Sequence, residues 1–428
     1  MSKSNGYSWG RLTAAKAEVS TPAWHHDLSL PENPTLPLGL GRSYGDSCQL
    51  SQGQLIDTTH LNRLIDFDEE NGLLRAEAGI SLDAILSFCV PRGWFLPTTP
   101  GTRQVTLGGA IANDIHGKNH HQAGCMGNHV PRFELLRSDG QRVLCEMGHP
   151  LHSATIGGLG LTGLLTWAEV QLVSISSAYV DAEQIKFQGL DEFQELSQES
   201  ESTWEHTVAW IDCLAPGCRG IFIRGNWSSE GTLKVHREAK AAIPVDFPEF
   251  VLNKFSIQAF NTLYYRRLFK KQSQSHQHYA PFFHPLDALQ GWNRIYGKRG
   301  FYQYQCVTPI EAGAEPMREI LKTIQVAGQG SFLAVLKRFG DRPSPGLLSF
   351  PREGLTLALD FPNRGEASLK LFEKLDQLVR DSGGRLYPAK DARMSAEDFH
   401  HFYPQLEEFT RHLDPNFTSD FWSRMTQS

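Results

Sequence analysis

Three glycines crowd into one short segment near the N-terminus, Gly39 to Asp46, which reads GLGRSYGD. Glycine lets the backbone turn tightly, and successive amide N–H groups in such a turn form a concave site that favours phosphate. The segment is not the dinucleotide fingerprint G-x-G-x-x-G, because its third glycine, Gly45, comes one residue late. It also lacks the Gly-Lys-Ser/Thr of a P-loop. The residues alone leave an ordinary turn open as the alternative.

A second segment, Pro100 to His121, combines small residues with a dense polar run. The small residues Gly108 to Ala112 would let a flat ring or a pyrophosphate approach a helix backbone closely. The polar run after them has a solvated loop as its alternative. His116 and His120 have the spacing of metal ligands on a helix, but Gly117 interrupts a helix between them. Because no further ligands complete a zinc set, we predict no metal site.

Two further segments carry signals that are weaker in isolation. Ile156 to Gly163 holds four glycines directly before a predicted strand, so its backbone passes close to a neighbour, although a tight structural turn explains it equally well. Lys390 stands in the segment Tyr387 to Asp391, which reads YPAKD. A lone lysine is usually at the surface, and Asp391 offers it an ion-pair partner.

The elements that must position these residues divide the chain into three regions. Short apolar runs and glycines from Leu36 to Val173 predict an α+β cofactor domain, and Ser81 is a suitable N-cap for a helix there. The aromatic-rich region from Ala178 to Gly384 suits a substrate-binding sheet, and within it Leu268 to Phe283 is predicted to be a mobile loop. The predicted strands are 55–57, 73–78, 143–145, 164–172, 221–224, 302–307, 332–339 and 355–361, and the predicted helices are 81–89, 315–326, 368–382 and a segment from Ser395.

Composition excludes several classes of protein. The 428 residues carry 41 basic and 47 acidic side chains, a net charge of −6, which argues against general nucleic-acid binding. The seven cysteines are odd in number and form no Cys-x-x-Cys pair, so a disulfide framework is not expected and a reducing compartment is. We see no signal peptide at the N-terminus and no apolar run near the roughly 20 residues that span a bilayer.

The order and spacing of these segments together resemble the FAD-binding domain (PCMH type) of the vanillyl-alcohol oxidase superfamily. Within that superfamily the chain most resembles the oxidases that act on polyprenyl-phosphoryl ribose. The resemblance covers nearly the whole chain, and Leu107 to His121 and Tyr387 to Arg393 are its most specific parts. The matching stretches also include 39–46, 100–106, 124–129, 156–163, 337–340, 348–351 and 360–362.

The resemblance implies an α+β fold, a two-domain flavoprotein of the vanillyl-alcohol oxidase type. Its FAD-binding domain would be discontinuous, from residues 1–177 and 385–428. A substrate-binding domain with an antiparallel sheet would occupy residues 178–384. The isoalloxazine ring would lie where the two domains meet.

The resemblance also implies three sets of site residues. In the catalytic set, Lys390, His116 and Tyr44, Lys390 would place a cation beside the flavin, and His116 or Lys390 would take the substrate's proton. The cofactor-binding residues would be Gly39, Leu40, Gly41, Arg42, Ser43, Tyr44, Gly101, Thr102, Gly108, Gly109, Ala112, Asn113, His116, Gly117, Gly163 and Tyr387. The substrate-binding residues would be Lys337, Gln303, Gln305, Asn363 and Lys390.

Two positions depart from patterns found in the superfamily. Oxidases of aldonolactones and alditols commonly carry, in the first glycine-rich loop, a histidine that bonds covalently to the flavin. This chain has Arg42 there, so we expect FAD to be bound non-covalently. Ala358 stands where some of the ribose oxidases carry a pocket-facing cysteine. Because the oxidation needs no thiol, we expect the activity to survive with a pocket of different shape.

The implied activity is oxidation of the 2′-hydroxyl of a polyprenyl-phosphoryl-β-D-ribose to the 2′-keto sugar. This is the first half of an epimerisation to the arabinose donor of an envelope polysaccharide, and a separate NADH-dependent short-chain reductase would complete it. The expected location is the cytoplasm, with a peripheral contact at the inner face of the membrane left open. An oxidase of a soluble sugar, alditol or aldonolactone is the alternative, and Arg42 counts against it. A binding protein that has lost its flavin is a third hypothesis, disfavoured by the intact glycines.

Overall fold

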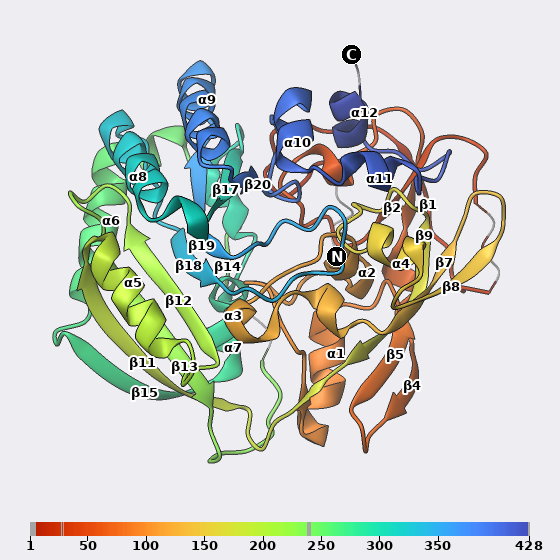
Figure 1. The fold of residues 1–428 in the computed structure, drawn as a ribbon, viewed down its shortest axis with the longest axis horizontal. Coiled ribbons are helices and arrows are strands. Elements are labelled where there is room, and N and C mark those ends of the chain that lie inside the picture. The colour runs from red at the N-terminus through yellow and green to blue at the C-terminus, as the bar shows by residue number, and fades with distance from the viewer. Residues whose placement is uncertain (1–5, 27, 29, 238–240, 427–428) are drawn as a thin grey trace.

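Two groups of β-sheets make up the chain (Figure 1). The computed structural model describes residues 6–26, 28, 30–237 and 241–426. The N-terminal group, in red to yellow in Figure 1, holds a three-stranded parallel sheet and a five-stranded antiparallel sheet. A larger antiparallel sheet of eight strands forms the other half, and the C-terminal helices return to the N-terminal half.

The N-terminal elements follow the glycine-rich segments closely. The parallel sheet has the order β1 (Glu18–Ser20), β3 (Gln54–Asp57), β2 (Thr35–Leu38), and the five-stranded sheet has the order β4 (Leu64–Asp68), β5 (Leu73–Glu77), β9 (Leu164–Gln171), β7 (Arg132–Leu136), β8 (Arg142–Glu146). The strands β6 (Trp94–Phe95) and β10 (Val173–Ser174) pair separately. The helices are α1 (Leu82–Cys89), α2 (Leu107–Ala112), α3 (His120–Ala123) and α4 (Pro150–Thr155), with 3₁₀ turns η1 (Asp46–Cys48), η2 (Thr58–His60), η3 (Val90–Arg92) and η4 (Met126–His129).

The eight-stranded sheet is built from residues 179–386. Its order is β15 (Gln272–His278), β11 (Tyr179–Gln188), β13 (Arg219–Trp227), β12 (His206–Asp212), β18 (Ala334–Phe339), β19 (Gly354–Pro362), β17 (Phe301–Pro309), β20 (Arg385–Leu386). The associated helices are α5 (Gly189–Ser200), α6 (Lys254–Arg266), α7 (Tyr279–Phe283), α8 (Glu315–Ala327) and α9 (Glu366–Asp381). Short elements are β14 (Ala241–Ala242), β16 (Leu289–Gln290), η5 (Glu249–Val251), η6 (Pro285–Ala288), η7 (Trp292–Tyr296) and η8 (Ile310–Ala312), and the chain ends with α10 (Ala396–Phe402), α11 (Leu406–Thr410) and α12 (Asp420–Thr426).

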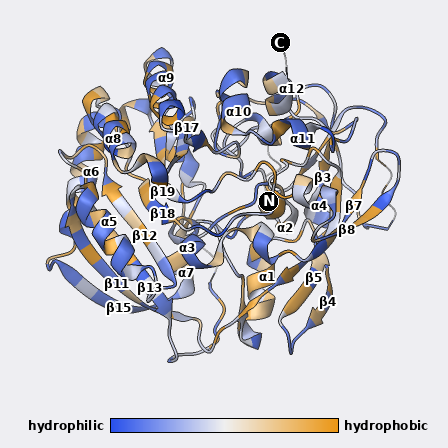
Figure 2. Ribbon diagram, viewed as in Figure 1, coloured by the Kyte–Doolittle hydropathy of each residue, from blue (hydrophilic) through white to orange (hydrophobic). Residues whose placement is uncertain are grey.

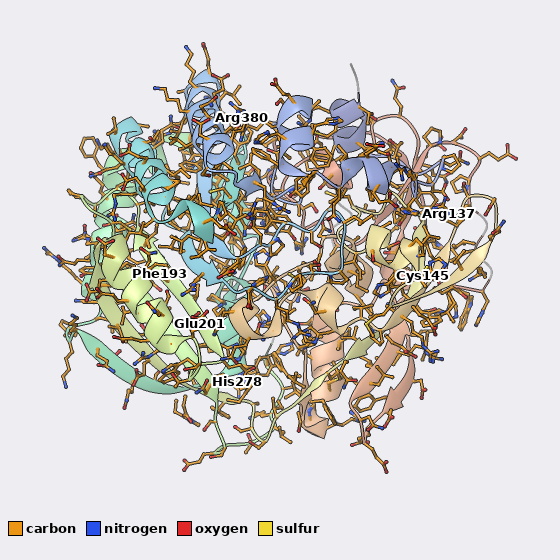
Figure 3. All side chains as sticks on the ribbon, in the orientation of Figure 1. Arg137, Cys145, Phe193, Glu201, His278 and Arg380 are labelled. Atoms are coloured by element: carbon orange, nitrogen blue, oxygen red, sulfur yellow. The ribbon has the colours of Figure 1, made fainter. Side chains whose placement is uncertain are left out.

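One face of the eight-stranded sheet is an apolar core under α5, α8 and α9. Successive side chains of a strand point to opposite faces, so Leu357, Leu359 and Phe361 of β19 all reach this core. The buried side chains of α8 recur at three- and four-residue spacing and face the same core. Phe193 of α5 is buried against the sheet, as Figure 3 shows. Figure 2 shows these helices with mixed colouring, which fits amphipathic helices over a core.

The strands and helices predicted from periodicity are present. Ser81 caps α1, because its hydroxyl accepts a hydrogen bond from the amide of Ala84 at 3.1 Å. One prediction is wrong: Leu268 to Phe283 is not a mobile loop. It contains β15, which pairs antiparallel with β11, and the helix α7. The register pairs Tyr179 with His278, so backbone hydrogen bonds fix a segment whose side chains are mostly polar.

The C-terminal helices tie the end of the chain to its beginning. Arg424 of α12 forms an ion pair with Asp46, 2.9 Å away, at the end of the glycine-rich segment. Strand β20, just beyond residue 384, pairs with β17 in the eight-stranded sheet. The domain boundaries after residues 177 and 384 stay a prediction. Parts of these predicted domains, residues 1–5, 27, 29, 238–240 and 427–428, lie outside the described residues.

Candidate functional site

The face of the eight-stranded sheet opposite the apolar core carries polar side chains. Alternation along β17 sends Gln303 and Gln305 to this face, and the paired strand β19 places Asp360 opposite Gln303. The amide nitrogen of Gln303 donates to the Asp360 carboxylate at 2.6 Å. Ala358, half-buried, lies opposite Gln305 on the same face. The sheet therefore presents a carboxylate and two amides side by side.

Lys390 lies above this polar face. Its ammonium is 4.2 Å from the centre of the Tyr44 ring, a cation–π contact. The Tyr44 amide donates to the Ala389 carbonyl at 3.0 Å, so the N-terminal glycine-rich segment and the Lys390 segment are joined through their backbones. Burial lowers the pKa of Lys390, and the Asp360 charge partly offsets that lowering. The structure thus brings together two of the three predicted catalytic residues and adds Asp360 as a neighbour.

His116, the third predicted catalytic residue, is buried at the same face. The Gln305 amide nitrogen lies 3.1 Å from its Nε2, and its Nδ1 has no partner within the described part of the chain. The ring packs between Phe339, with centroids 4.8 Å apart, and Tyr387, at 5.6 Å. Burial and, next, the charge of Lys337 hold the pKa of His116 well below its usual value. The imidazole is therefore neutral at neutral pH.

Two more lysines point into the same region. Lys337 donates to the Gly117 carbonyl at 3.2 Å, and burial lowers its pKa to about 7. Lys118 lies 3.4 Å from the Phe283 carbonyl, and burial lowers its pKa to about 8. Both side chains are half-buried, so they remain reachable from the space they line. Because these half-buried lysines lack a nearby negative charge among the described residues, the region favours binding of an anion.

The N-terminal glycine-rich segment forms an open turn beside α2, which we call the cradle. The amides of residues 40–43 donate to no acceptor within the described residues. Gly41 has a φ of +61°, and a Cβ atom there would have no neighbour within 4 Å, so the turn is open on one side. A Cβ at Gly39 would lie 2.3 Å from the Thr106 hydroxyl, which caps α2. Unpaired amides in an open turn beside α2 fit the pyrophosphate of FAD.

Several other residues that the resemblance assigns to cofactor binding lie on or near α2. Thr102 donates to Asp287 of η6 at 2.5 Å, so the second half of the chain holds this loop. The Tyr387 hydroxyl donates to the Asn113 carbonyl at 2.6 Å, directly after α2. The other predicted residues near α2 are Gly101, Gly108, Gly109, Ala112 and Gly117.

Three of the predicted site residues make local contacts that give a structural reason for the residue type at that position. A Cβ at Gly163 would lie 2.8 Å from the Leu136 carbonyl, so this glycine lets β9 pack against β7. Asn363 follows β19, and its side chain donates to the Arg299 carbonyl and accepts from the Gly365 amide. Arg42 donates to the Leu40 carbonyl and lies over the Trp9 ring.

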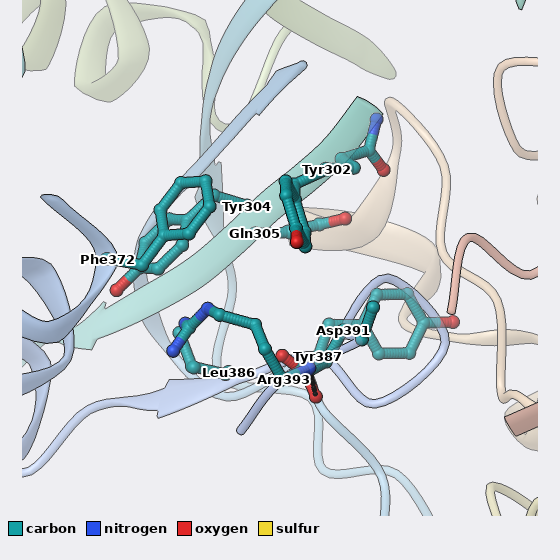
Figure 4. A pocket seen from close by; sticks show the side chains of 10 residues that line it. Tyr302, Tyr304, Gln305, Phe372, Leu386, Tyr387, Asp391 and Arg393 are labelled. Carbon is teal, nitrogen blue, oxygen red and sulfur yellow. Dashed lines mark hydrogen bonds between the residues drawn. The ribbon is translucent and has the colours of Figure 1, made fainter. Parts of the chain in front are cut away.

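A small pocket lies between β17 and the segment after β20 (Figure 4). Gln303, Gln305 and Tyr387 are on its wall, so it borders the polar face of the sheet. Arg393 and Asp391 line the side formed by the C-terminal segment. Among the described residues, no cluster of three or more His, Cys, Asp or Glu side chains could hold a metal ion.

Sequence reasoning missed Asp360 and Lys118 as site residues. Asp360 stands in a motif, Asp-Phe-Pro, that supported the family resemblance, but it received no role. The two-residue alternation of the predicted strand 355–361 places Asp360 opposite to the apolar side chains and was the signal available. Lys118 lies in the polar run after Gly108 to Ala112, where its neighbours drew attention first.

The comparison with protein families identifies the cofactor. Residues 30–146 match the model of the FAD binding domain, which spans the cradle and α2. A decaprenylphosphoryl-β-D-ribose oxidase from Mycolicibacterium smegmatis is 40% identical over 409 residues, which cover 90% of this chain and 88% of that protein. The chain is an FAD-dependent oxidoreductase, and the open cradle, the lysines and the unpaired His116 nitrogen fit that cofactor.

Similarity that extends over most of the chain also fixes the family. An uncharacterized protein from the mprA 5′ region of Streptomyces coelicolor is 30% identical over 371 residues, 81% of this chain and 100% of that protein. A D-lactate dehydrogenase from Anaerostipes hadrus is 23% identical over 136 residues, 30% of this chain and 29% of that enzyme. This chain belongs to the decaprenylphosphoryl-β-D-ribose oxidase family.

Proposed function

We propose that the protein oxidises the 2′-hydroxyl of a polyprenyl-phosphoryl-β-D-ribose to the 2′-keto sugar. The observation that carries this proposal is the 40% identity to decaprenylphosphoryl-β-D-ribose oxidase, because it extends over 90% of the chain. It therefore includes the eight-stranded sheet as well as the FAD-binding part. The cluster of lysines at the polar face supports a phosphate-bearing substrate.

Lys390 performs the proton transfer in this proposal. Burial favours its neutral form, which can take the hydroxyl proton at Nζ. FAD, when bound, supplies the two-electron acceptor, which gains negative charge as the alcohol is oxidised. Lys390 becomes cationic at that moment and stabilises the charge, while Asp360 and the Tyr44 ring hold the ammonium in place. His116 is the weaker base of the two because its pKa is lower still.

The other predicted residues hold the two ligands. Gln303, Gln305 and Lys337 share the polar face and orient the sugar, and Asn363 stays a predicted contact at the end of β19. The predicted cofactor residues from Gly39 to Gly163 and Tyr387 hold FAD. Arg42, which donates a hydrogen bond to the Leu40 carbonyl, stands where related oxidases carry the flavin-linking histidine, so FAD is bound non-covalently in this proposal. Acid precipitation of the protein should leave all flavin in the supernatant.

The chemistry of the product requires a partner. A 2′-keto sugar becomes the epimeric alcohol when hydride returns to the opposite face, so an NADH-dependent short-chain reductase would complete the epimerisation. The product would serve as an arabinose donor for envelope polysaccharide. The proposed location is the cytoplasm with a peripheral contact at the inner face of the membrane. Within the described residues, no helix is both long and apolar enough to cross a membrane.

Anaerobic reduction of the bound flavin tests the substrate. The yellow protein is mixed without oxygen with polyprenyl-phosphoryl ribose, with free ribose or with an aldonolactone. We expect only the lipid-linked sugar to bleach the visible absorbance. Bleaching by the free sugar or the lactone instead would replace the proposal with a soluble-sugar oxidase.

A further inference from the structure

Helix α6 presents large apolar side chains to the solvent. Phe255 and Leu263 are 80% and 72% exposed, and Ala259 stands between them at the four-residue spacing of one helix face. Phe269, three residues after the helix, is 98% exposed. Figure 1 shows α6 at the outer edge of the eight-stranded half, away from the N-terminal sheets. Side chains of this size in one patch usually mark an interaction surface.

The segment that carries this apolar face is basic. The sequence from Phe250 to Leu286 contains no aspartate or glutamate. It contains five basic residues, which are Lys254, Arg266, Arg267, Lys270 and Lys271. Lys271 pairs with Glu192 at 2.9 Å, and within the described residues it is the one of the five with a carboxylate partner. An apolar helix face flanked by unpaired cations complements an anionic lipid surface.

Aromatic contacts connect this face to the interior. Phe260 of α6 contacts Phe332 with ring centroids 5.7 Å apart, and Phe332 stacks on Tyr296 at 5.6 Å. Tyr296 stacks on Phe301 at 4.1 Å, and Phe301 meets Tyr44 at 5.5 Å.

This aromatic series ends at the proposed site, because the Tyr44 ring carries the Lys390 ammonium. Packed aromatic side chains thus link α6 to Lys390 through the interior, because Tyr296, Phe301 and Tyr44 are buried. A substrate with a long prenyl chain needs a lipid surface nearby, since its tail is insoluble in water and its sugar must reach Lys390.

We propose that the exposed face of α6, with Phe255, Leu263 and Phe269 and the surrounding cations, docks on an anionic lipid bilayer. The docked protein would then receive the sugar-phosphate end of a substrate whose prenyl tail stays in the membrane. The role of docking in substrate delivery rests on the proposed function, while the docking itself depends only on this surface.

Vesicle binding by the complete FAD-loaded protein tests this surface. Vesicles of phosphatidylcholine, with or without phosphatidylglycerol, are sedimented with wild type, with the double variant F255S/L263S, and with a control, M147S/L369S. The control removes Met147 and Leu369, which are 69% and 37% exposed on other elements. We expect salt-sensitive binding of wild type and control to the anionic vesicles, weakened about tenfold or more in F255S/L263S. Wild type that stays in the supernatant, or a variant that binds equally, would overturn the proposal.

Two further measurements separate the other outcomes. Turnover of a short-chain, water-soluble prenyl-phosphoryl ribose without vesicles should be equal in wild type and F255S/L263S. Loss of that turnover in both proteins would contradict the proposed function and leave the docking result intact. Sedimentation velocity should give the same mass for wild type and variant. A wild-type dimer that the double substitution dissociates would overturn the proposal in favour of a second copy as the occupant.

Discussion

The two faces of the eight-stranded sheet use the same strands for opposite purposes. Along β19, Leu357, Leu359 and Phe361 lie in the apolar core, while Ala358 and Asp360 between them lie on the polar face. The core side is sealed by α5, α8 and α9. The other side carries the amides, lysines and carboxylate that surround Lys390.

The two faces therefore contribute differently to stability and to activity. Leu357, Leu359 and Phe361 of the core face are fully buried and carry no polar group, so they contribute through burial and packing. Side chains of the polar face are shielded from water. This burial lowers the pKa of Lys337 to about 7 and also lowers the pKa of His116. Substitutions on the two faces should therefore separate stability from activity.

Lys390→Ala should have the largest effect on activity. It removes the proton acceptor and the cation while leaving the sheet intact, so substrate-dependent flavin reduction should fall by about 10³-fold or more. Stopped-flow absorbance without oxygen measures that rate. Lys374→Ala, at an exposed position on α9, is the matched control and should react like wild type. A variant at Lys390 that keeps a near wild-type rate shows that the assigned role is wrong.

Leu359→Ala should have the largest effect on stability. Leu359 is completely buried in the core face, so the cavity should lower the free energy of unfolding by about 2–5 kcal/mol. Urea unfolding followed by fluorescence measures the change, and Leu263→Ala on exposed α6 should change little. The rate per folded molecule should stay near wild type. A large loss of rate with unchanged stability would erase the distinction between the faces.

The elements of the core face were the more predictable from sequence. Their apolar periodicity gave α8 and β19 to within two residues, since burial repeats locally along the chain. Strand β15 was missed because it is a polar edge strand, QSQSHQH, whose partner β11 lies almost a hundred residues away. Pairing with β11 and not local propensity determines that strand.

Site residues that stand in a recognised motif could be predicted from the sequence, whereas a site residue whose role depends on strand pairing could not. Lys390, His116 and Tyr44 were found through the resemblance, and their proximity is a fact of the fold. The role of Asp360 depends on its register with Gln303 across two strands, which no local signal encodes. Gly163 is the opposite case. The resemblance assigned it to cofactor binding, but the packing of β9 against β7 explains why a glycine stands there.

Asp360→Asn sharpens the comparison by changing the pH dependence of the reaction. The Asp360 charge raises the pKa of Lys390, so its removal should lower that pKa further. Because the neutral lysine is the base, the rise of the reduction rate with pH should move to lower pH. Asp381→Asn, at an exposed position on α9, should leave the profile in place. A shift to higher pH, or a rate that falls as pH rises, would contradict Lys390 as the base.

Ala358→Cys should have the smallest effect. Ala358 is half-buried on the polar face opposite Gln305, so a thiol there adds one atom at a partly exposed position. Thermal stability should change by about 1 kcal/mol or less, and the reduction rate should stay within about threefold of wild type. A thiol-reactive probe should label one more cysteine in the variant than in wild type, in which Cys48 is half-buried and the other six cysteines are buried. Failure to label would show that residue 358 is closed to the pocket.

The position of the broken C–H bond tests the central claim most directly. Polyprenyl-phosphoryl ribose with deuterium on carbon 2′ is compared with the same molecule labelled on carbon 3′, in anaerobic single-turnover reduction of the bound flavin. The account predicts a primary isotope effect, a several-fold slower reduction, for the 2′ label and an unchanged rate for the 3′ label. A primary effect from the 3′ label, or a lipid-linked sugar that fails to reduce the flavin, would contradict it.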